Sequence, residues 1–484
     1  MKTKIVLLLC TIWYGNLIGA QEPIPAEYSC PHQFSKDQFP PPLEDENQKS
    51  RIAADWKRQL SVDIAELEEP FLKDKRAAFE RRMTYQSDLL DHEAFLWYDS
   101  LQLLVDELAQ RLLDHNDIKE EDRVRFLLYR STIPNASCLG EGTMLLHLAL
   151  AYRLRSTEQL AFVMAHELAH YHLNHVNQRI FGRIEFLNSE TTKKKAKASR
   201  KGKAFANREL LSWLGNHQLN LNQHSREHEL QTDSLGLVFF LNAGFAPSAA
   251  LAALQALAVI DRPKYTVPPL ETWFDFPDFP WREHWGKSQL SGLSLVQPSE
   301  VDDPALRTHP KLEQRIRQVR ALLPPSDSSS FRDDLCNWHP SMELDLLRYH
   351  YQTRNSFAAL LGGLEILGQN PDHRYARAII AHTLIDLCWA RQAHEYSKRI
   401  PPPSVRSMRD GAFRLATFLD HLSYSELKSI AQQWGMATLP RLRNTEIKTA
   451  LSLKLEALEG GFADQPAGWS DFTQRWPNSI FDSF

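Results

Sequence analysis

The segment FVMAHELAHYHLNH, residues 162–175, places four histidines and one glutamate among small and apolar residues. On an α-helix, which advances about 100° per residue, His166 and His170 share one face and lie one turn apart. Glu167 lies beside this pair, where its carboxylate can reach a water on a metal held by the two imidazoles. In the HExxH arrangement two neutral imidazoles bind Zn²⁺, and the glutamate takes a proton from water as the water attacks a carbonyl. The spacing therefore predicts one Zn²⁺ per chain and hydrolytic chemistry.

The surrounding sequence predicts the helix that would carry these residues. STEQLAFVMAHELAHYHLNHVNQRIF begins with Ser156 or Thr157 as N-cap, and apolar residues continue at helical spacing with no Gly or Pro until Gly182. On such a helix His172 and His175 lie about 240° and 180° from the first histidine, so we expect them to face away from the metal. The alternative is an amphipathic core helix with incidental histidines.

A catalytic zinc usually has three protein ligands, so a third must come from elsewhere in the chain. In the downstream segment SREHELQTD, Glu229 and Asp233 are four residues apart and share a helix face. This spacing suits a third ligand and a carboxylate that orients a ligand imidazole.

HELAH followed by SREHELQTD resembles the zinc metallopeptidases of peptidase family M48, which includes the CAAX prenyl proteases, the heat-shock protease HtpX and the periplasmic β-barrel assembly-enhancing protease. Upstream, IPNASCLGEG is similar to the family's Asn-Ala strand segment and glycine turn. Downstream, NAGFAPSAA and THPKLEQRI are similar to its turn into the next helix and to its His-Pro segment with a later Arg. The resemblance covers about residues 85–325.

The resemblance assigns roles to individual residues. It implies the zinc ligands His166, His170 and Glu229, the general base Glu167, the orienting carboxylate Asp233 and the supporting cations Arg226 and Arg315. One departure is ELQTD, where relatives often read Glu-x-Glu-Ala-Asp, and we interpret it as tuning around the ligands because the first Glu and the Asp are present.

Two further features of the site follow from the resemblance. The strand segment with Asn135, Ala136 and Gly140 is expected to pair with the backbone of an extended substrate. His309, in the His-Pro segment, is either a fourth, inhibitory zinc ligand or a group that stabilises the oxyanion. A loop histidine that caps local structure is the alternative for His309.

The expected fold is mainly α: an α+β zincin-like peptidase domain with a short sheet, followed by a C-terminal helical region. We place a signal peptide at 1–20, an irregular and helical lead-in at 21–84, the metallopeptidase domain at 85–325 and the helical domain at 326–484. In the last of these, SFAALLGGLEILGQNPDHRYARAIIAHTLIDLCWARQAHEYSKRI resembles one tetratricopeptide unit, with no clear second repeat.

Two segments have unusual composition. RPKYTVPPLETWFDFPDFPWREHWGK is dense in Pro and aromatic residues, and it is interpreted either as a lid or client-binding surface over the cleft or as a loop packed onto the domain. The basic run KKKAKASRKGK, 193–203, predicts a solvated loop or helix extension, with contact to anionic lipid or acidic clients as the functional alternative.

The chain begins MKTKIVLLLCTIWYGNLIGAQEP, with Lys2 and Lys4, an apolar run and then Gly19 and Ala20, which is the order of a secretory signal peptide. An uncleaved signal anchor is the alternative. No other apolar run approaches the roughly 20 residues of a spanning helix, so we expect a periplasmic or secreted protein. For the cysteines, a Cys336–Cys388 bridge and isolated buried thiols are both open.

The composition excludes some classes of partner. Apolar residues make up 43% of the chain, and 56 basic residues nearly balance 60 acidic ones, so we expect no nucleic-acid partner. We expect protein or peptide substrates, including outer-membrane assembly clients by the resemblance, and peripheral membrane contact. The sequence thus predicts a zinc metalloendopeptidase in envelope protein quality control or processing. The alternative is a latent protease that acts mainly as a client-binding, chaperone-like protein with a closed zinc site.

Overall fold

The computed structural model describes residues 34–35, 37–38, 40, 46–97, 99–118, 123–199, 226–260, 266–286, 311–324, 332–404, 408, 410–462 and 465–482. Contacts between these residues divide the chain into two compact units. The first unit contains the described residues from 46 to 260 and from 311 to 336. The second, which we call the helical unit, contains those from 34 to 40, from 266 to 286 and from 337 onward.

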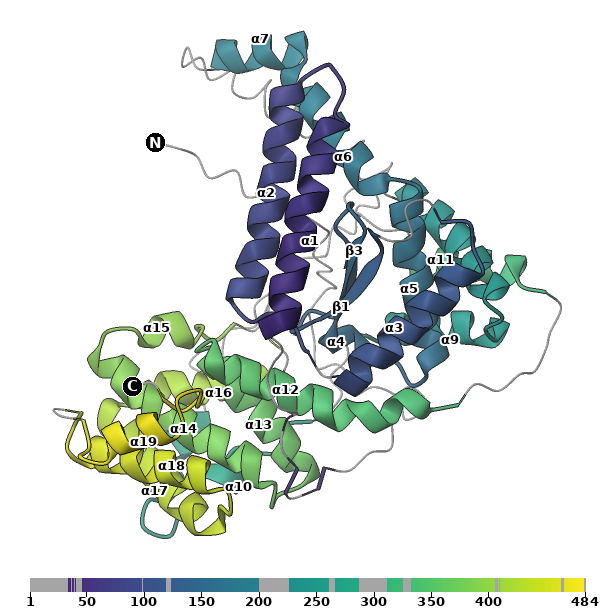
Figure 1. Ribbon diagram of the computed structural model, residues 1–484. Helices are drawn as coiled ribbons and strands as arrows, with labels where there is room; N and C mark the ends of the chain where they lie inside the picture. Colours follow the sequence, from purple (N-terminus) through teal and green to yellow (C-terminus); the bar gives the residue numbers. More distant parts are fainter. Residues whose placement is uncertain are drawn as a thin grey trace. The chain divides into compact units, whose positions relative to one another are not determined.

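The first unit opens with a helical hairpin (Figure 1), formed by α1 (Glu46–Ala65) and α2 (Leu72–Asp91). Trp56 of α1 is 2% exposed, and its indole Nε1 donates a hydrogen bond to Thr143 Oγ1 at 2.9 Å. Helix α3 (Asp99–Asp114) follows and packs against the first strand. The buried Trp56 side chain therefore connects the hairpin to strand β3 of the sheet.

Three short strands form the sheet, in the order β1-β3-β2. Strand β1 (Arg125–Tyr129) runs parallel to β3 (Thr143–His147), and β2 (Ala136–Cys138) pairs with β3 in the antiparallel direction. Their apolar runs, RFLLY and TMLLH, are buried at the central positions, as expected for strands covered on both faces. Since β2 pairs with β3 alone among the described strands, it forms an edge of this sheet.

The remaining elements of the first unit are helical. They are α4 (Leu148–Ala151), α5 (Thr157–His172), α6 (His175–Asn188), α7 (Glu190–Ser199), a helix over residues 226–242, α9 (Pro247–Ala258) and α11 (Leu312–Leu322). The predicted helix from Ser156 toward Gly182 is broken, because Asn174 adopts a left-handed conformation with φ of 57° and separates α5 from α6. Asparagine tolerates this conformation better than most residues, since its short polar side chain bonds locally.

The helical unit contains α12 (His339–Gln352), α13 (Ser356–Gln369), α14 (Arg374–Gln392), α15 (Tyr396–Arg399), α16 (Asp410–His421), α17 (Tyr424–Thr438), α18 (Thr445–Glu459) and α19 (Trp469–Arg475). These helices share one apolar core. Mainly α structure with a short sheet is thus confirmed as the fold class. Whether these helices form a repeat stays a prediction.

The Pro-rich and aromatic segment belongs to the helical unit, where its described part forms α10 (Glu271–Phe274) and a 3-10 turn at Glu283–Gly286. Phe274 and Trp285 are 0% exposed, and their rings lie 4.8 and 5.9 Å from the ring of Phe418. The aromatic residues therefore supply core to the helical unit, and not to the peptidase domain at 85–325 in which this segment was predicted to lie.

Two further expectations concern the cysteines and the membrane. Cys336 is disulfide-bonded, whereas Cys388 is a buried free thiol in α14, so the Cys336–Cys388 pairing is wrong. Within the described ranges, no helix has both the length and the apolarity to cross a membrane. The expected signal peptide lies outside the described residues.

Candidate metal centre

Helix α5 is fixed at its start and buried along its length. Ser156 Oγ accepts a hydrogen bond from the backbone N–H of Gln159, and the Gln159 side chain accepts one from the backbone N–H of Ser156, which completes a capping box. One face of α5 carries His166, Glu167 and His170, which are 8%, 7% and 8% exposed. The local sequence thus places two imidazoles and a carboxylate on a helix that is held in the interior.

A glycine allows the third ligand to approach. Gly236 lies on the helix at 226–242, and a Cβ added there would come within 3.0 Å of His166 Cα. Few Cβ atoms lie that close to a neighbouring backbone, so glycine favours this close approach of the two helices. Glu229, two turns earlier on the same helix, is thereby brought beside α5.

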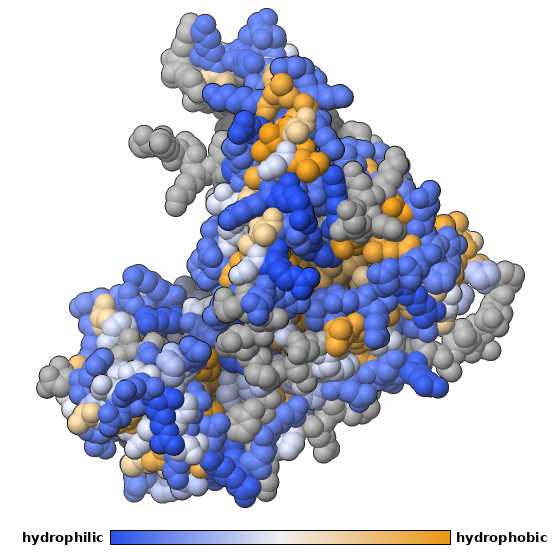
Figure 2. All heavy atoms as spheres, viewed as in Figure 1, coloured by the Kyte–Doolittle hydropathy of each residue, from blue (hydrophilic) through white to orange (hydrophobic). Residues whose placement is uncertain are grey.

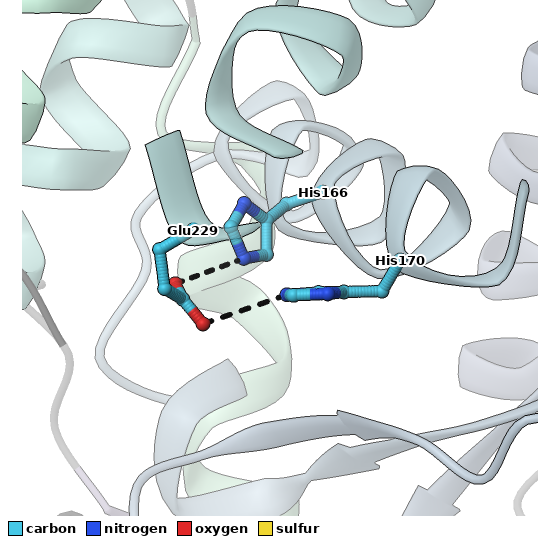
Figure 3. Close-up of side chains that lie close together, drawn as sticks. All are labelled: His166, His170 and Glu229. Carbon is cyan, nitrogen blue, oxygen red and sulfur yellow. Dashed lines mark ion pairs between the residues drawn. The ribbon is translucent and has the colours of Figure 1, made fainter. Parts of the chain in front are cut away.

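The three predicted ligands meet at one point. His166 Nε2 lies 3.5 Å from Glu229 Oε2, and His170 Nε2 lies 3.5 Å from Glu229 Oε1 (Figure 3). One ligand atom from each of the three residues lies within 4.8 Å of the others. Zn–N bonds of about 2.0–2.1 Å at tetrahedral angles would place neighbouring ligand atoms about 3.3 Å apart. The three residues therefore fit a zinc ion as three of its four tetrahedral ligands.

Asp233 and Arg315 support the first of these ligands. Asp233 Oδ1 lies 3.1 Å from His166 Nδ1, and the same carboxylate accepts two hydrogen bonds of 2.7 Å from the Arg315 guanidinium. Burial alone would raise the pKa of Asp233, but Arg315 and His166 hold it below its ordinary value. A charged carboxylate is thus fixed on Nδ1 and leaves Nε2 of His166 to face the metal position.

The same contacts change the basicity of His166 in the metal-free protein. Burial would lower the pKa of His166, but the carboxylates of Asp233 and Glu229 raise it to about 9. Arg315 also contacts the ligand carboxylate, with Nη1 3.6 Å from Glu229 Oε2. Without metal, a proton on His166 therefore balances part of the negative charge in this buried group.

His175 is a member of the site that the helical pattern missed. Because the chain turns at Asn174, His175 begins α6 and its Nδ1 lies 3.1 Å from Nδ1 of His170. Thr232 Oγ1 lies 3.3 Å from His175 and 3.4 Å from His170. The unbroken helix assumed for His175 is wrong, but its contact is with Nδ1 of His170, whereas Nε2 of His170 faces Glu229. His175 therefore lies behind a candidate ligand and is not among the described residues that form the ligand group. A possible αL residue at Asn174 was the only local signal.

The substrate residues predicted from the strand segment are partly brought together. Asn135 and Ala136 line the same cleft as His166, Glu167 and Glu229. Backbone bonds join Asn135 to His147 and Leu139 to Thr143, so the intervening Ala136 turns its N–H and C=O away from β3. Ala136 therefore directs backbone hydrogen-bonding groups to the open edge of β2.

The other predicted residues take different places. Gly140, with φ of 96°, lies in the turn after β2 and is not among the described residues that line the cleft. Arg226 is half-buried at the first described turn of the 226–242 helix, also away from that lining. His309 lies outside the described residues, so its role as ligand or oxyanion stabiliser stays a prediction.

The turn between β2 and β3 is held by the α1–α2 hairpin, which sequence reasoning did not connect with the site. Gln86 donates a hydrogen bond of 2.6 Å to Glu141, and Arg82 Nε lies 3.6 Å from the same carboxylate. Arg82 also pairs with Asp63 of α1 at 2.5 Å. The residues that fix this turn are far away in the sequence, and no motif marks them.

The lining of the cleft is partly apolar and partly polar. Its apolar lining comes from α4, α5 and α9 and from the residues that follow α9: Leu150, Phe162, Val163, Leu254, Leu257 and Ile260. Helix α6 contributes Val176 and Arg179.

Residues 100–323 match the family model described as Peptidase family M48. The matched residues include the three candidate ligands, Glu167, Asp233 and Arg315, while the α1–α2 hairpin lies before the match.

Proposed function

The chain belongs to peptidase family M48 through residues 100–323, and from this premise we propose that it is a zinc-dependent endopeptidase. The observation that carries the proposal is the meeting of His166, His170 and Glu229 in one cleft with Glu167. His166 and His170 would hold zinc through Nε2, and Glu229 would hold it through its carboxylate. Bound zinc supplies a Lewis acid that activates water and polarises a carbonyl.

Glu167 is proposed as the general base. It is 7% exposed and lines the cleft, so its carboxylate is largely shielded from bulk solvent. It would take the proton of the attacking water at a carboxylate oxygen and deliver it to the departing amine. Meanwhile Asp233 would keep the His166 ring oriented.

The open edge of β2 is proposed to hold the substrate. An extended peptide can add to an exposed strand edge through main-chain hydrogen bonds, as in β-strand addition. The N–H and C=O of Ala136 face that edge beside the candidate metal ligands. This pairing would present a peptide bond to the metal without requiring a particular side chain.

The decisive experiment compares Glu167→Gln with the wild type. We expect wild type to bind about one zinc per chain by elemental analysis and to cleave an unfolded protein such as casein. The variant should keep its zinc and lose cleavage by about 10²-fold or more, since the base is removed and the ligands are not. Glu185→Gln, the same change at an exposed position of α6, is the matched control and should behave as wild type.

Other outcomes would favour different functions. If wild type binds zinc and neither protein cleaves, the client-binding alternative with a closed zinc site is favoured. If no zinc binds, the metallopeptidase chemistry proposed for this chain is refuted. Cleavage that survives in Glu167→Gln would refute the role of Glu167 alone.

The cellular role is proposed on the N-terminal sequence and on the family. We propose an exported protein in envelope quality control or processing, with the helical unit positioning clients. Exposed apolar residues of the α1–α2 hairpin and the lysines of α7 support peripheral membrane contact. The face in Figure 2 shows apolar residues over the upper part of the α1–α2 hairpin, whose Val62 and Leu72 are 37% and 36% exposed. Helix α7 carries a cluster of lysines at 193–197, which suits anionic headgroups.

A further inference from the structure

All but one of the charged or ionisable residues that line the cleft belong to the candidate metal centre or contact it. His166, His170 and Glu229 form the ligand group, with Glu167 beside them. Arg315 also reaches the lining, but its charge is matched by the two 2.7 Å hydrogen bonds to Asp233. These side chains therefore already interact with one another or are placed to bind the metal.

Arg179 is the exception. It is half-buried on α6 and lines the cleft, and among the described residues none forms an ion pair or hydrogen bond with its guanidinium. The start of α6 fixes its position. His175, four residues earlier on the same helix face, lies 3.1 Å from the ligand His170. Within the described part of the chain, Arg179 thus brings a positive charge to the cleft lining from α6 with no acidic partner.

Much of the remaining lining of the cleft is apolar. Phe162 and Val163 lie about one turn before His166 on α5, and Leu254 and Leu257 come from α9. A peptide extended along β2 would therefore meet both these apolar side chains and the Arg179 guanidinium in the cleft.

We infer that Arg179 is a specificity-determining residue that selects peptide substrates with an aspartate or glutamate close to the scissile bond. This inference rests on the proposed peptidase function. A guanidinium matches a carboxylate with two parallel hydrogen bonds, which a neutral or basic side chain cannot provide. A bound peptide without a carboxylate there would cover the charge and leave it unpaired, and a lysine would add repulsion.

The expected effect is a change in kcat/KM of about tenfold. A hydrogen bond between charged groups is worth about 10–100-fold in binding, and the lower end applies because Arg179 is only half-buried and partly screened by solvent. The preference should shrink as ionic strength rises, since an exposed pair is screened over about 10 Å at 0.1 M salt.

The test uses peptides with blocked termini that carry Glu, Gln or Lys at successive positions on either side of one cleavable bond. Wild type is expected to prefer Glu over Gln by about tenfold at one position and to disfavour Lys there. Arg179→Gln should lose the preference, and Arg179→Glu should invert it in favour of Lys. Arg183→Glu, the same charge change one turn later at an exposed position of α6, is the control and should keep the wild-type preference.

A binding measurement separates this inference from the proposed function. Fluorescence anisotropy of the same peptides with Glu167→Gln and with the double variant Glu167→Gln/Arg179→Glu reports selection without turnover. Equal cleavage of all peptides by wild type would overturn the inference and leave the peptidase proposal intact. No cleavage together with Arg179-dependent binding of the Glu peptide would support the selection and refute the peptidase proposal.

The remaining outcomes also decide against the inference. An acidic preference that persists in Arg179→Glu would place the selecting cation elsewhere. A preference that appears only when the peptide has a free C-terminal carboxylate would overturn selection by a side chain and favour recognition of a chain end. Neither cleavage nor selective binding by any protein would overturn both proposals.

Discussion

Replacing Asp233 by asparagine tests how much the carboxylate that orients His166 contributes to zinc binding, while all three candidate ligands stay in place. Asp233 is 0% exposed and accepts contacts from two partners, Arg315 at 2.7 Å and His166 Nδ1 at 3.1 Å. An asparagine has one oxygen and one NH₂, so at least one of these donors would face another donor. The substitution keeps the shape of the residue and removes the charge.

Two magnitudes follow from these contacts. Loss of a carboxylate that orients a ligand imidazole typically lowers metal affinity 10–100-fold, which is about 1.4–2.7 kcal/mol. Removing one partner of a buried ion pair typically costs about 3–5 kcal/mol of folding free energy. The lower end is expected here, since Glu229 stays 3.6 Å from the Arg315 guanidinium.

The assay must allow for the proton on His166. Below pH 9 this proton competes with zinc, because Asp233 and Glu229 raise the pKa of His166 to about 9. Asp233→Asn would weaken that competition and mask part of the loss at pH 7. Zinc affinity should therefore be measured by chelator competition at pH 9 as well as at pH 7, with the larger loss expected at pH 9. Urea unfolding of the metal-free proteins gives the change in stability.

A matched control exists in the helical unit. Asp345 is also 0% exposed and is ion-paired with Arg348, but it lies far from the ligands in the sequence and in the other unit. Asp345→Asn should lower stability and leave zinc affinity within about twofold of wild type. If Asp233→Asn binds zinc as wild type does at pH 9, the carboxylate does not orient His166 and the reasoning is refuted.

Three further predictions concern protons and the strand turn. The apparent zinc affinity of wild type should rise about tenfold per pH unit up to about pH 9 and then level off. The reason is that the pKa of His166 is raised to about 9, so one proton must leave this ring before zinc binds. Isothermal titration across this range checks the prediction, and an affinity that does not change from pH 7 upward would contradict it. In the metal-free protein the stabilisation linked to this proton should be complete below about pH 6.5 and lost as pH rises through 9. Gly142→Ala should lower the free energy of unfolding by about 2 kcal/mol or more and raise KM. The φ of Gly142 is 110°, and a Cβ added there would lie 2.5 Å from the carbonyl oxygen of Arg123. Gly182→Ala, in α6 with nothing within 4 Å, should be neutral or stabilising, and equal urea midpoints for the two variants would argue against a strained turn.

The parts of the fold that depend on local spacing were predictable. Ser156 and Gln159 form the capping box at the start of α5, and helical periodicity places His166 and His170 on one face. The four-residue spacing of Glu229 and Asp233 likewise puts both on one face of their own helix. These relations lie within one or two turns of helix, where side-chain positions follow from backbone geometry alone.

The parts that depend on distant partners were not predictable. Periodicity extends through Asn174 without interruption, so the turn that brings His175 to His170 could not be read from apolar spacing. The aromatic segment contains no signal that Phe274 packs on Phe418, 144 positions later, because any apolar surface can bury it. Arg82 and Glu141 form an ion pair whose partners are chosen by tertiary structure.

The hairpin contacts also bear on how this protein can be divided for study. A fragment trimmed to the family match would begin at residue 100 and omit Gln86, Arg82 and Trp56. Glu141, in the turn that joins β2 and β3, would then lose its buried partners, and Thr143, the first residue of β3, would lose its indole donor. Such a fragment, even if it is soluble, would lack the contacts that hold the turn between β2 and β3 in the full chain. A fragment made for study should therefore begin at α1, before the first residue of the family match.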